Sequence, residues 1–316
     1  MTVATLLKKM QYEQKLGAAQ AGLLLDLHEK RIFSLHRELR FFLYAGILLV
    51  VAGTGLTIKQ YFANLGDIAI ISALTLGCVS AFAYCFIKGR PFDTDEVASP
   101  HLAFDYVLFF GCAFFAMDIA YIETQFSVLG DAWKNYLLIS VALFFFLAYR
   151  FDNRLVLSMA LSTLAAWFGF TLSGHDRFLF AENYRLYAMA YGVVVFCSGF
   201  LLYRLELKKH FFDIYLNFAV HFLCLALLSG VAEDKILSIY FPALTAVCVA
   251  LAFYAAHIRK FIYLLYAVIY GYIGVSIVMV NFIHRQTLLT FAYFILSSLA
   301  VIGVIFKMSR KFREEK

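Results

Sequence analysis

The chain has 316 residues, of which 63% are hydrophobic and 15% are charged, and its formal net charge is +6 at pH 7. A soluble globular domain is closer to half apolar and a quarter charged, so this composition excludes an ordinary soluble protein. The apolar residues are also grouped into blocks of about 20, the length that a helix needs to cross a bilayer. We therefore expect an all-α polytopic membrane protein.

The first 37 residues precede the apolar blocks and form a separate element. Residues 1–37 combine amphipathic patterning with a high content of Lys, Glu and Gln, and they predict a short cytosolic helical segment, either a helical hairpin or a helix lying on the inner leaflet. Residues 38–306 form the predicted transmembrane domain, and residues 307–316 a basic cytosolic tail. The domain is expected to hold ten transmembrane helices, at 41–58, 68–87, 104–122, 135–149, 155–173, 186–203, 211–231, 237–256, 261–282 and 287–306.

The basic residues predict how these helices are oriented. If the N-terminus is cytosolic, 21 of the 27 Lys and Arg residues fall in cytosolic segments. The six in outer segments are Lys59, Lys134, Arg177, Arg185, Lys235 and Arg285. Cytosolic loops of membrane proteins carry such an excess of positive charge, so both termini are expected on the cytosolic side. Anionic lipid headgroups account for the net positive charge, and no nucleic-acid partner is expected.

The start of the chain contains three motifs in succession: "LGAAQAGLLLDL", "FFLYAGILLVVAGTGL" and "YFANLGD". This junction resembles a bacterial family of membrane proteins catalogued as domain of unknown function 2157. That family combines a Glu/Gln/Leu-rich cytosolic lead, a glycine-spaced first span and an Ala-Asn-Trp turn. Here the turn reads Ala63, Asn64, Leu65, with leucine in place of the tryptophan. The resemblance covers about the first quarter of the chain, and it implies a bacterial inner-membrane protein without known chemistry.

The predicted seventh span carries a polar stripe along one helical face. Asp213, Asn217 and His221 follow one another at four-residue spacing, which places them on the same side of a helix. Polar side chains at membrane depth avoid lipid, so the stripe is expected to face other helices or a wet cavity. His221 is the one histidine inside a predicted span, and it could be a titrating or substrate-binding group or an interhelical hydrogen-bonding residue.

Two other spans carry residues that could contribute to the same path. Asp118 lies within the third span, where it could face inward as an ion site or reach outward beside Glu123. Tyr266 and Tyr270 share one face of the ninth span, and they could line a cavity or simply pack. We treat these three residues, with the stripe of the seventh span, as candidates for a substrate or ion path.

A second set of polar residues lies at predicted cytosolic helix ends. Two His and two Asp side chains that converge there would suit a divalent metal, although His and Asp are also ordinary residues at helix ends. The candidate ligands are His101, Asp105, His210, Asp213 and His257.

The sequence contains no nucleotide-binding, dinucleotide-binding or hydrolase motif, and no cofactor is expected. The leading hypothesis is a transporter-like bundle, a facilitator or secondary transporter for a small solute or ion. The alternative is a non-catalytic membrane assembly or scaffold protein, acting with a membrane protein partner or as a homo-oligomer. A third hypothesis, less favoured, is a metal-dependent intramembrane enzyme.

Overall fold

The computed structural model describes residues 42–43, 45–47, 49–50, 53, 66–127, 133–172, 182–233, 239–283 and 287–314. The predicted N-terminal segment and most of the predicted first span lie outside these residues. Within them the chain forms helices and connections without a β-strand. The helices are α4 (Asp67–Lys88), α5 (Leu102–Phe126), α6 (Trp133–Phe151), α7 (Arg154–Leu172), α8 (Glu182–Arg204), the short 3₁₀ helix η2 (Lys209–Phe211), α9 (Phe212–Glu233), α10 (Tyr240–Ile258), α11 (Phe261–Phe282) and α12 (Thr287–Glu314).

Seven of these helices are long and apolar enough to cross a membrane: α4, α5, α8, α9, α10, α11 and α12. The apolar stretches of α6 and α7 are shorter, Asn135–Phe151 and Arg154–Gly169. The structure therefore indicates a helical protein in contact with a lipid bilayer, with seven candidate spans among the described residues. α12 continues as a helix through Glu314, beyond residue 306, where the tenth span was predicted to end, and into the predicted basic tail.

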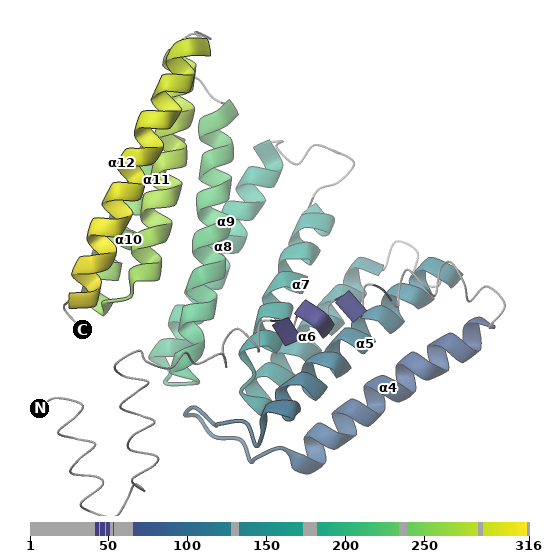
Figure 1. The fold of residues 1–316 in the computed structure, drawn as a ribbon. Coiled ribbons are helices and arrows are strands. Elements are labelled where there is room, and N and C mark those ends of the chain that lie inside the picture. The colour runs from purple at the N-terminus through teal and green to yellow at the C-terminus, as the bar shows by residue number, and fades with distance from the viewer. Residues whose placement is uncertain are drawn as a thin grey trace, which may run out of the picture.

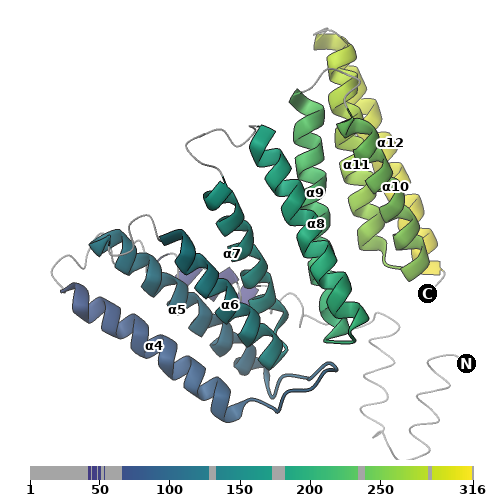
Figure 2. The ribbon, with the colours of Figure 1, turned by 180° about the vertical axis from the view of Figure 1, so that it is seen from behind.

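The helices α4–α7 form one group and α10–α12 another, and α8 and α9 lie side by side between them (Figure 1; Figure 2). α9 is the central helix, because 56% of its membrane-spanning window is buried and each of the other six candidate spans is less buried. Its neighbouring residues Tyr215 and Leu216 belong to two different hydrophobic cores. One core extends toward α4–α8 and the other toward α10 and α11. α9 therefore joins the two groups.

Two glycines of α8 allow its backbone to lie close to α9. A Cβ atom at Gly192 would be 3.1 Å from the carbonyl oxygen of Ala219, and one at Gly199 would be 2.4 Å from Cβ of Tyr215. Tyr215 is buried, and its hydroxyl is 3.0 Å from that of Tyr149. Small residues permit this close approach between membrane helices, and the seven-residue spacing puts both glycines on the face of α8 that meets α9.

We expect Gly199→Ala to destabilise the protein by about 1–3 kcal/mol, the usual cost of overpacking a well-packed core. Thermal unfolding in detergent measures the effect. Gly303→Ala on α12 is the matched control, because no atom of another part of the described chain lies within 4 Å of a Cβ there. Equal stability of the two variants would contradict the close packing of α8 on α9.

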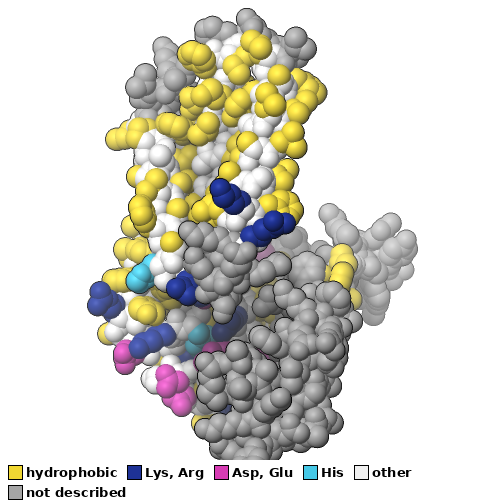
Figure 3. All heavy atoms as spheres, turned by 60° about the vertical axis from the view of Figure 1, so that its left-hand side comes forward, with side chains coloured by type: hydrophobic (Ala, Val, Ile, Leu, Met, Phe, Trp, Pro, Cys, Tyr) yellow, Lys and Arg dark blue, Asp and Glu magenta, His cyan; other side chains and the backbone are white. Residues whose placement is uncertain are grey.

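Charged side chains gather toward one end of the molecule, and hydrophobic side chains cover much of the visible surface above them (Figure 3). At that end three connections meet around a buried ion pair. Lys208 Nζ lies 2.8 Å from Asp152 Oδ2, and the two side chains are only 1% and 2% exposed. His210 Nε2 is 2.5 Å from the other carboxylate oxygen of Asp152. We name Asp152, Lys208 and His210 the connector cluster.

Backbone groups of the α4–α5 connection complete the connector cluster. The Val97 amide donates to Asp152 Oδ2 at 2.6 Å, and Lys208 Nζ donates to the Asp95 carbonyl at 2.7 Å. The next residue, Asn153, accepts from the amides of Leu155 and Val156 and so caps α7. The cluster therefore fixes the α4–α5, α6–α7 and α8–α9 connections relative to one another.

Replacing Lys208 by Met should destabilise the fold by about 3–5 kcal/mol, because it leaves a buried carboxylate without its ammonium partner. The control is Lys209→Met at the adjacent position, where an exposed lysine pairs with exposed Glu206 and little change is expected. Chemical or thermal unfolding in detergent compares the two variants. A similar small effect of both would show that the buried pair does not hold the connections together.

Candidate functional site

The polar stripe of α9 and the tyrosines of α11 meet in one interface. His221 Nδ1 lies 2.6 Å from the Tyr270 hydroxyl. The imidazole ring also lies edge-on to the Tyr266 ring, with 4.6 Å between the centroids. Asp213 lies at one end of the same interface. Its carboxylate accepts a hydrogen bond of 3.0 Å from the Tyr263 hydroxyl and forms an ion pair with Lys260. We call this interface the α9–α11 seam and define it by six residues: Asp213, Asn217, His221, Tyr263, Tyr266 and Tyr270.

Local helix geometry places these side chains together. On α9 the residues at 213, 217 and 221 recur every four positions, and on α11 those at 263, 266 and 270 recur after three and four, so each set forms one stripe. His221 lies about 14 Å along α9 at a rise of about 1.5 Å per residue, close to the middle of a hydrocarbon core about 30 Å thick. The seam therefore brings a histidine and two phenolic side chains together near mid-membrane depth.

Asn217 leaves one polar atom of the seam without a partner. Its side-chain amide Nδ2 donates to the backbone carbonyl of Asp213 at 2.7 Å, within the same helix. Its Oδ1 atom is buried and has no hydrogen-bond partner among the described residues. A buried carbonyl oxygen normally has a donor. Asn217 Oδ1 is thus the acceptor that a small polar ligand in this interface could use.

Asp118 belongs to a different helix contact. Its Oδ2 atom accepts a hydrogen bond of 2.7 Å from Thr75 Oγ1 of α4, and its Oδ1 atom is buried without a partner in the described part of the chain. The known partners of His221 come from α11. The structure therefore brings His221, Tyr266 and Tyr270 together, and it places Asp118 in the α4–α5 pair.

The residues considered as metal ligands are divided among separate contacts. His101 pairs with the Tyr84 hydroxyl at 2.7 Å, and Asp105 accepts from Ser99 at 2.6 Å. His210 belongs to the connector cluster and Asp213 to the seam. No group of three or more His, Cys, Asp or Glu side chains in the described ranges is arranged to hold a metal ion. The geometry therefore gives a metal centre at these residues no support.

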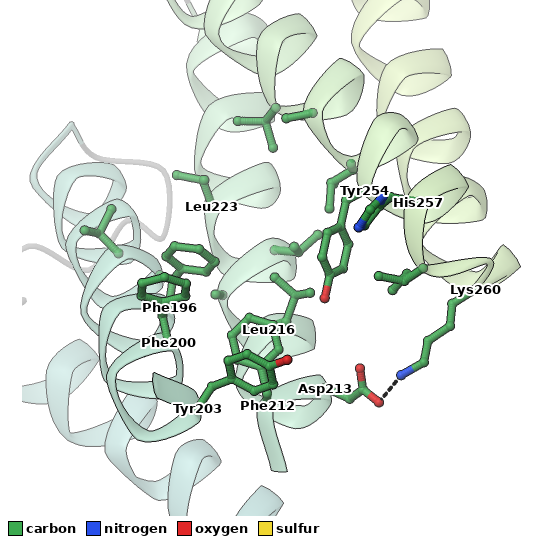
Figure 4. A pocket seen from close by; sticks show the side chains of 18 of the residues that line it. Phe196, Phe200, Tyr203, Phe212, Asp213, Leu216, Leu223, Tyr254, His257 and Lys260 are labelled. Atoms are coloured by element: carbon green, nitrogen blue, oxygen red, sulfur yellow. Dashed lines mark hydrogen bonds and ion pairs between the residues drawn. The ribbon is translucent and has the colours of Figure 1, made fainter. Parts of the chain in front are cut away.

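The connector cluster and a large groove are features that the sequence did not predict. The groove, of about 1060 Å³, lies between α8 and α10 with α9 as its floor (Figure 4). Its walls are mainly apolar, and they include Val193, Phe196, Phe200, Leu216, Leu223 and Leu251. We name it the α8–α10 groove. Its position depends on how two helices are spaced around a third, which a single sequence does not reveal.

Polar side chains gather at one end of the α8–α10 groove. Lys209, Asp213, His257 and Lys260 line that end, where α8 and α10 finish and α9 begins. Lys209 donates to the Glu206 carboxylate at 2.8 Å, and this hydrogen bond holds the pKa of the Glu206 carboxyl below its usual value. Figure 4 shows the ion pair of Lys260 and Asp213 beside this end. The groove therefore combines a long apolar surface with a charged end.

No family model, no curated protein and no solved structure matches this chain. The resemblance of the N-terminal quarter to domain of unknown function 2157 therefore stays a prediction. The function has to be argued from the seam and the groove themselves.

A double-mutant cycle tests the geometry of the seam. We expect His221→Leu and Tyr270→Phe to be coupled by about 0.6 kcal/mol, and by at most about 1.7 kcal/mol, the values typical of interhelical hydrogen bonds in membranes. Thermal or chemical unfolding of the wild type, both single variants and the double variant gives the coupling energy.

Tyr272→Phe supplies the control for this cycle. The Tyr272 hydroxyl lies 3.0 Å from Ser297 Oγ of α12, on another face of α11. Combined with His221→Leu, it should therefore be additive, with a coupling energy near zero and below that of the His221–Tyr270 pair. Coupling of His221 to Tyr272 as strong as that to Tyr270 would contradict the described seam.

Proposed function

We propose that the chain is a transporter-like bundle of ten spans in a bacterial inner membrane, with both termini cytosolic, that handles a small polar solute or ion. The distribution of basic residues supports the orientation. The connections and adjoining helix ends near the connector cluster contain Arg90, Arg154, Lys208, Lys209 and Lys260, and cytosolic loops are rich in such residues. Seven apolar helices support a multi-pass protein. No nucleotide-binding motif is present, so transport would be facilitated or coupled to an ion gradient.

The observation that carries this proposal is the α9–α11 seam. It places a histidine hydrogen-bonded to a tyrosine, and a buried amide oxygen without a described partner, at a depth where polar groups are costly. A small solute with one donor and one acceptor group fits these atoms. Its donor group would donate a hydrogen bond to Asn217 Oδ1, and its acceptor group would accept one from the Tyr270 hydroxyl or from the N–H of the imidazole. Binding would then exchange the His221–Tyr270 hydrogen bond for two contacts with the solute.

A second function, a membrane assembly or scaffold protein, is favoured by the pairing within the seam. His221 with Tyr270 and Asp213 with Tyr263 satisfy one another, and the rings of Tyr263 and Tyr270 are buried. Such pairs join helices without any ligand. In that case the protein would act through a membrane protein partner or a second copy of itself. A metal-dependent enzyme is not proposed, because no group of three or more His, Cys, Asp or Glu side chains among the described residues is arranged to hold a metal ion.

A ligand-stabilisation screen separates the two functions. Purified wild-type protein in detergent is heated with a panel of small solutes and cations, and the shift in unfolding temperature is measured. A transporter should show at least one stabilising solute, because binding to the folded state raises its stability. His221→Leu should remain folded and lose this shift, whereas Tyr272→Phe should keep it.

The scaffold function predicts a different result. His221→Leu would then unfold at a lower temperature than the wild type, and no solute in the panel would stabilise either protein. Asp118→Asn is measured in parallel, because loss of a cation-dependent shift in this variant alone would move the ion site to the α4–α5 pair. A solute that stabilises the wild type and His221→Leu equally would show that the seam does not bind it.

A further inference from the structure

The α8–α10 groove and the α9–α11 seam lie mainly on different faces of α9, and Asp213 is the seam residue that also lines the groove. Leu216, Ala219 and Leu223 form the floor of the groove, whereas Asn217 and His221 belong to the seam. The wall that α8 contributes is open to the surroundings: Val193, Phe196 and Phe200 are 52%, 41% and 42% exposed. On a membrane helix such a wall faces hydrocarbon, so the groove opens sideways into the bilayer.

The shape of the groove suits a chain-like apolar ligand. Its volume of about 1060 Å³ is at the upper limit of pockets that hold drug-sized molecules, which run to about 1000 Å³. In Figure 4 the aromatic side chains Phe196 and Phe200 face the groove from α8, and Leu216 and Leu223 line it from α9. These side chains offer no hydrogen-bonding group along most of its length. The ligand body that fits is an acyl chain.

The charged end of the groove holds three basic side chains and two carboxylates. Lys209 and Lys260 line it, and they pair with Glu206 and Asp213 respectively. The guanidinium of Arg204 lies 5.1 Å from the centroid of the Phe200 ring, which is itself part of the wall. The imidazole of His257 and the phenol of Tyr254 add further polar groups to the lining on the same side as Lys260 (Figure 4). Basic side chains at the membrane surface attract anionic headgroups.

We propose that the α8–α10 groove binds an anionic phospholipid from the leaflet at the end of the molecule that holds the connector cluster. An acyl chain lies along Phe196, Phe200 and Leu223, and the headgroup phosphate is bound by Lys260 and Lys209 beside His257. The Lys260–Asp213 ion pair sets the strength of this binding, since the carboxylate competes with the phosphate for the same ammonium group. The proposal does not depend on the seam, so either can fail alone.

The first experiment compares two phospholipids with identical acyl chains, phosphatidylglycerol and phosphatidylcholine. Each is added to the detergent-purified full chain in mixed micelles, and bound lipid is counted by native mass spectrometry alongside the unfolding temperature. The anionic lipid should bind more tightly. Inorganic phosphate is tested alone as a third probe and should have little effect, because it makes no use of the apolar walls.

Two charge variants should change this preference in opposite directions. Lys260→Gln should weaken phosphatidylglycerol binding about fivefold, the effect of one basic residue near an anionic membrane surface. Asp213→Asn should strengthen it, because Lys260 is released from its carboxylate partner. Lys88→Gln, an exposed lysine at the end of α4, is the matched control and should leave binding unchanged. A general loss of folding cannot produce the opposite signs at Lys260 and Asp213.

A third variant blocks the apolar part of the groove. Ala250 lines the groove from α10 and is exposed, so Ala250→Trp should fill it and reduce the binding of both phospholipids. Ala256→Trp is the control, since Ala256 is exposed on another face of the same helix and is not part of the lining.

Three results would overturn the proposal. Equal binding of the two phospholipids, together with no effect of Lys260→Gln, would remove the headgroup site. Unchanged lipid binding in Ala250→Trp would show that the lipid does not occupy the groove. Stabilisation by inorganic phosphate as large as that by phosphatidylglycerol would show an anion site without a lipid.

Discussion

The buried ion pair of Asp152 and Lys208 is the interaction on which the arrangement of the described helices depends. Membrane helices gain no hydrophobic driving force from association within lipid, so their relative positions rest on packing and on specific polar contacts. This pair lies where three connections converge, and both side chains are almost fully shielded from water. An ion pair in such a place is costly when it is incomplete. The connections are therefore held at one end, and the helices project from this common base (Figure 1).

α9 begins beside the connector cluster, and its contacts with other helices position them relative to that cluster. His210 of the connector cluster lies just before α9, and Phe211 is buried in the core shared with α6 and α7. Farther along, the helix packs against α8 through Gly192 and Gly199 and against α11 through the seam. The position of both candidate binding features thus follows from the location of one helix. The proposed solute would bind in the seam, and the proposed phospholipid would bind in the groove.

The positions of the helices could be predicted from the sequence, because a span needs a continuous apolar block of a known length. Residues 211–231 predicted the helix found at Phe212–Glu233, and 261–282 the one at Phe261–Phe282. Spacing also showed which residues share a face, including the stripe of Asp213, Asn217 and His221. Periodicity does not say which helix a face meets. The pairing of His221 with Tyr270, and of Asp118 with Thr75, therefore emerged only from the structure. Lys208 looked like an ordinary cytosolic charge, since its burial arises from connections that are distant in sequence.

Asp213 has two distinct sets of neighbours, and this has a thermodynamic consequence. Its carboxylate lines the α8–α10 groove and also accepts the hydrogen bond of Tyr263 in the α9–α11 seam. A phosphate that binds Lys260 in place of Asp213 would break the Lys260–Asp213 ion pair. Tyr263 of α11 would then be the remaining described donor to this carboxylate. If both proposed ligands bind, each changes the affinity for the other by the same free energy, as linkage requires. Through this one carboxylate, the lipid composition of the leaflet around the groove would then alter the binding of a solute in the seam.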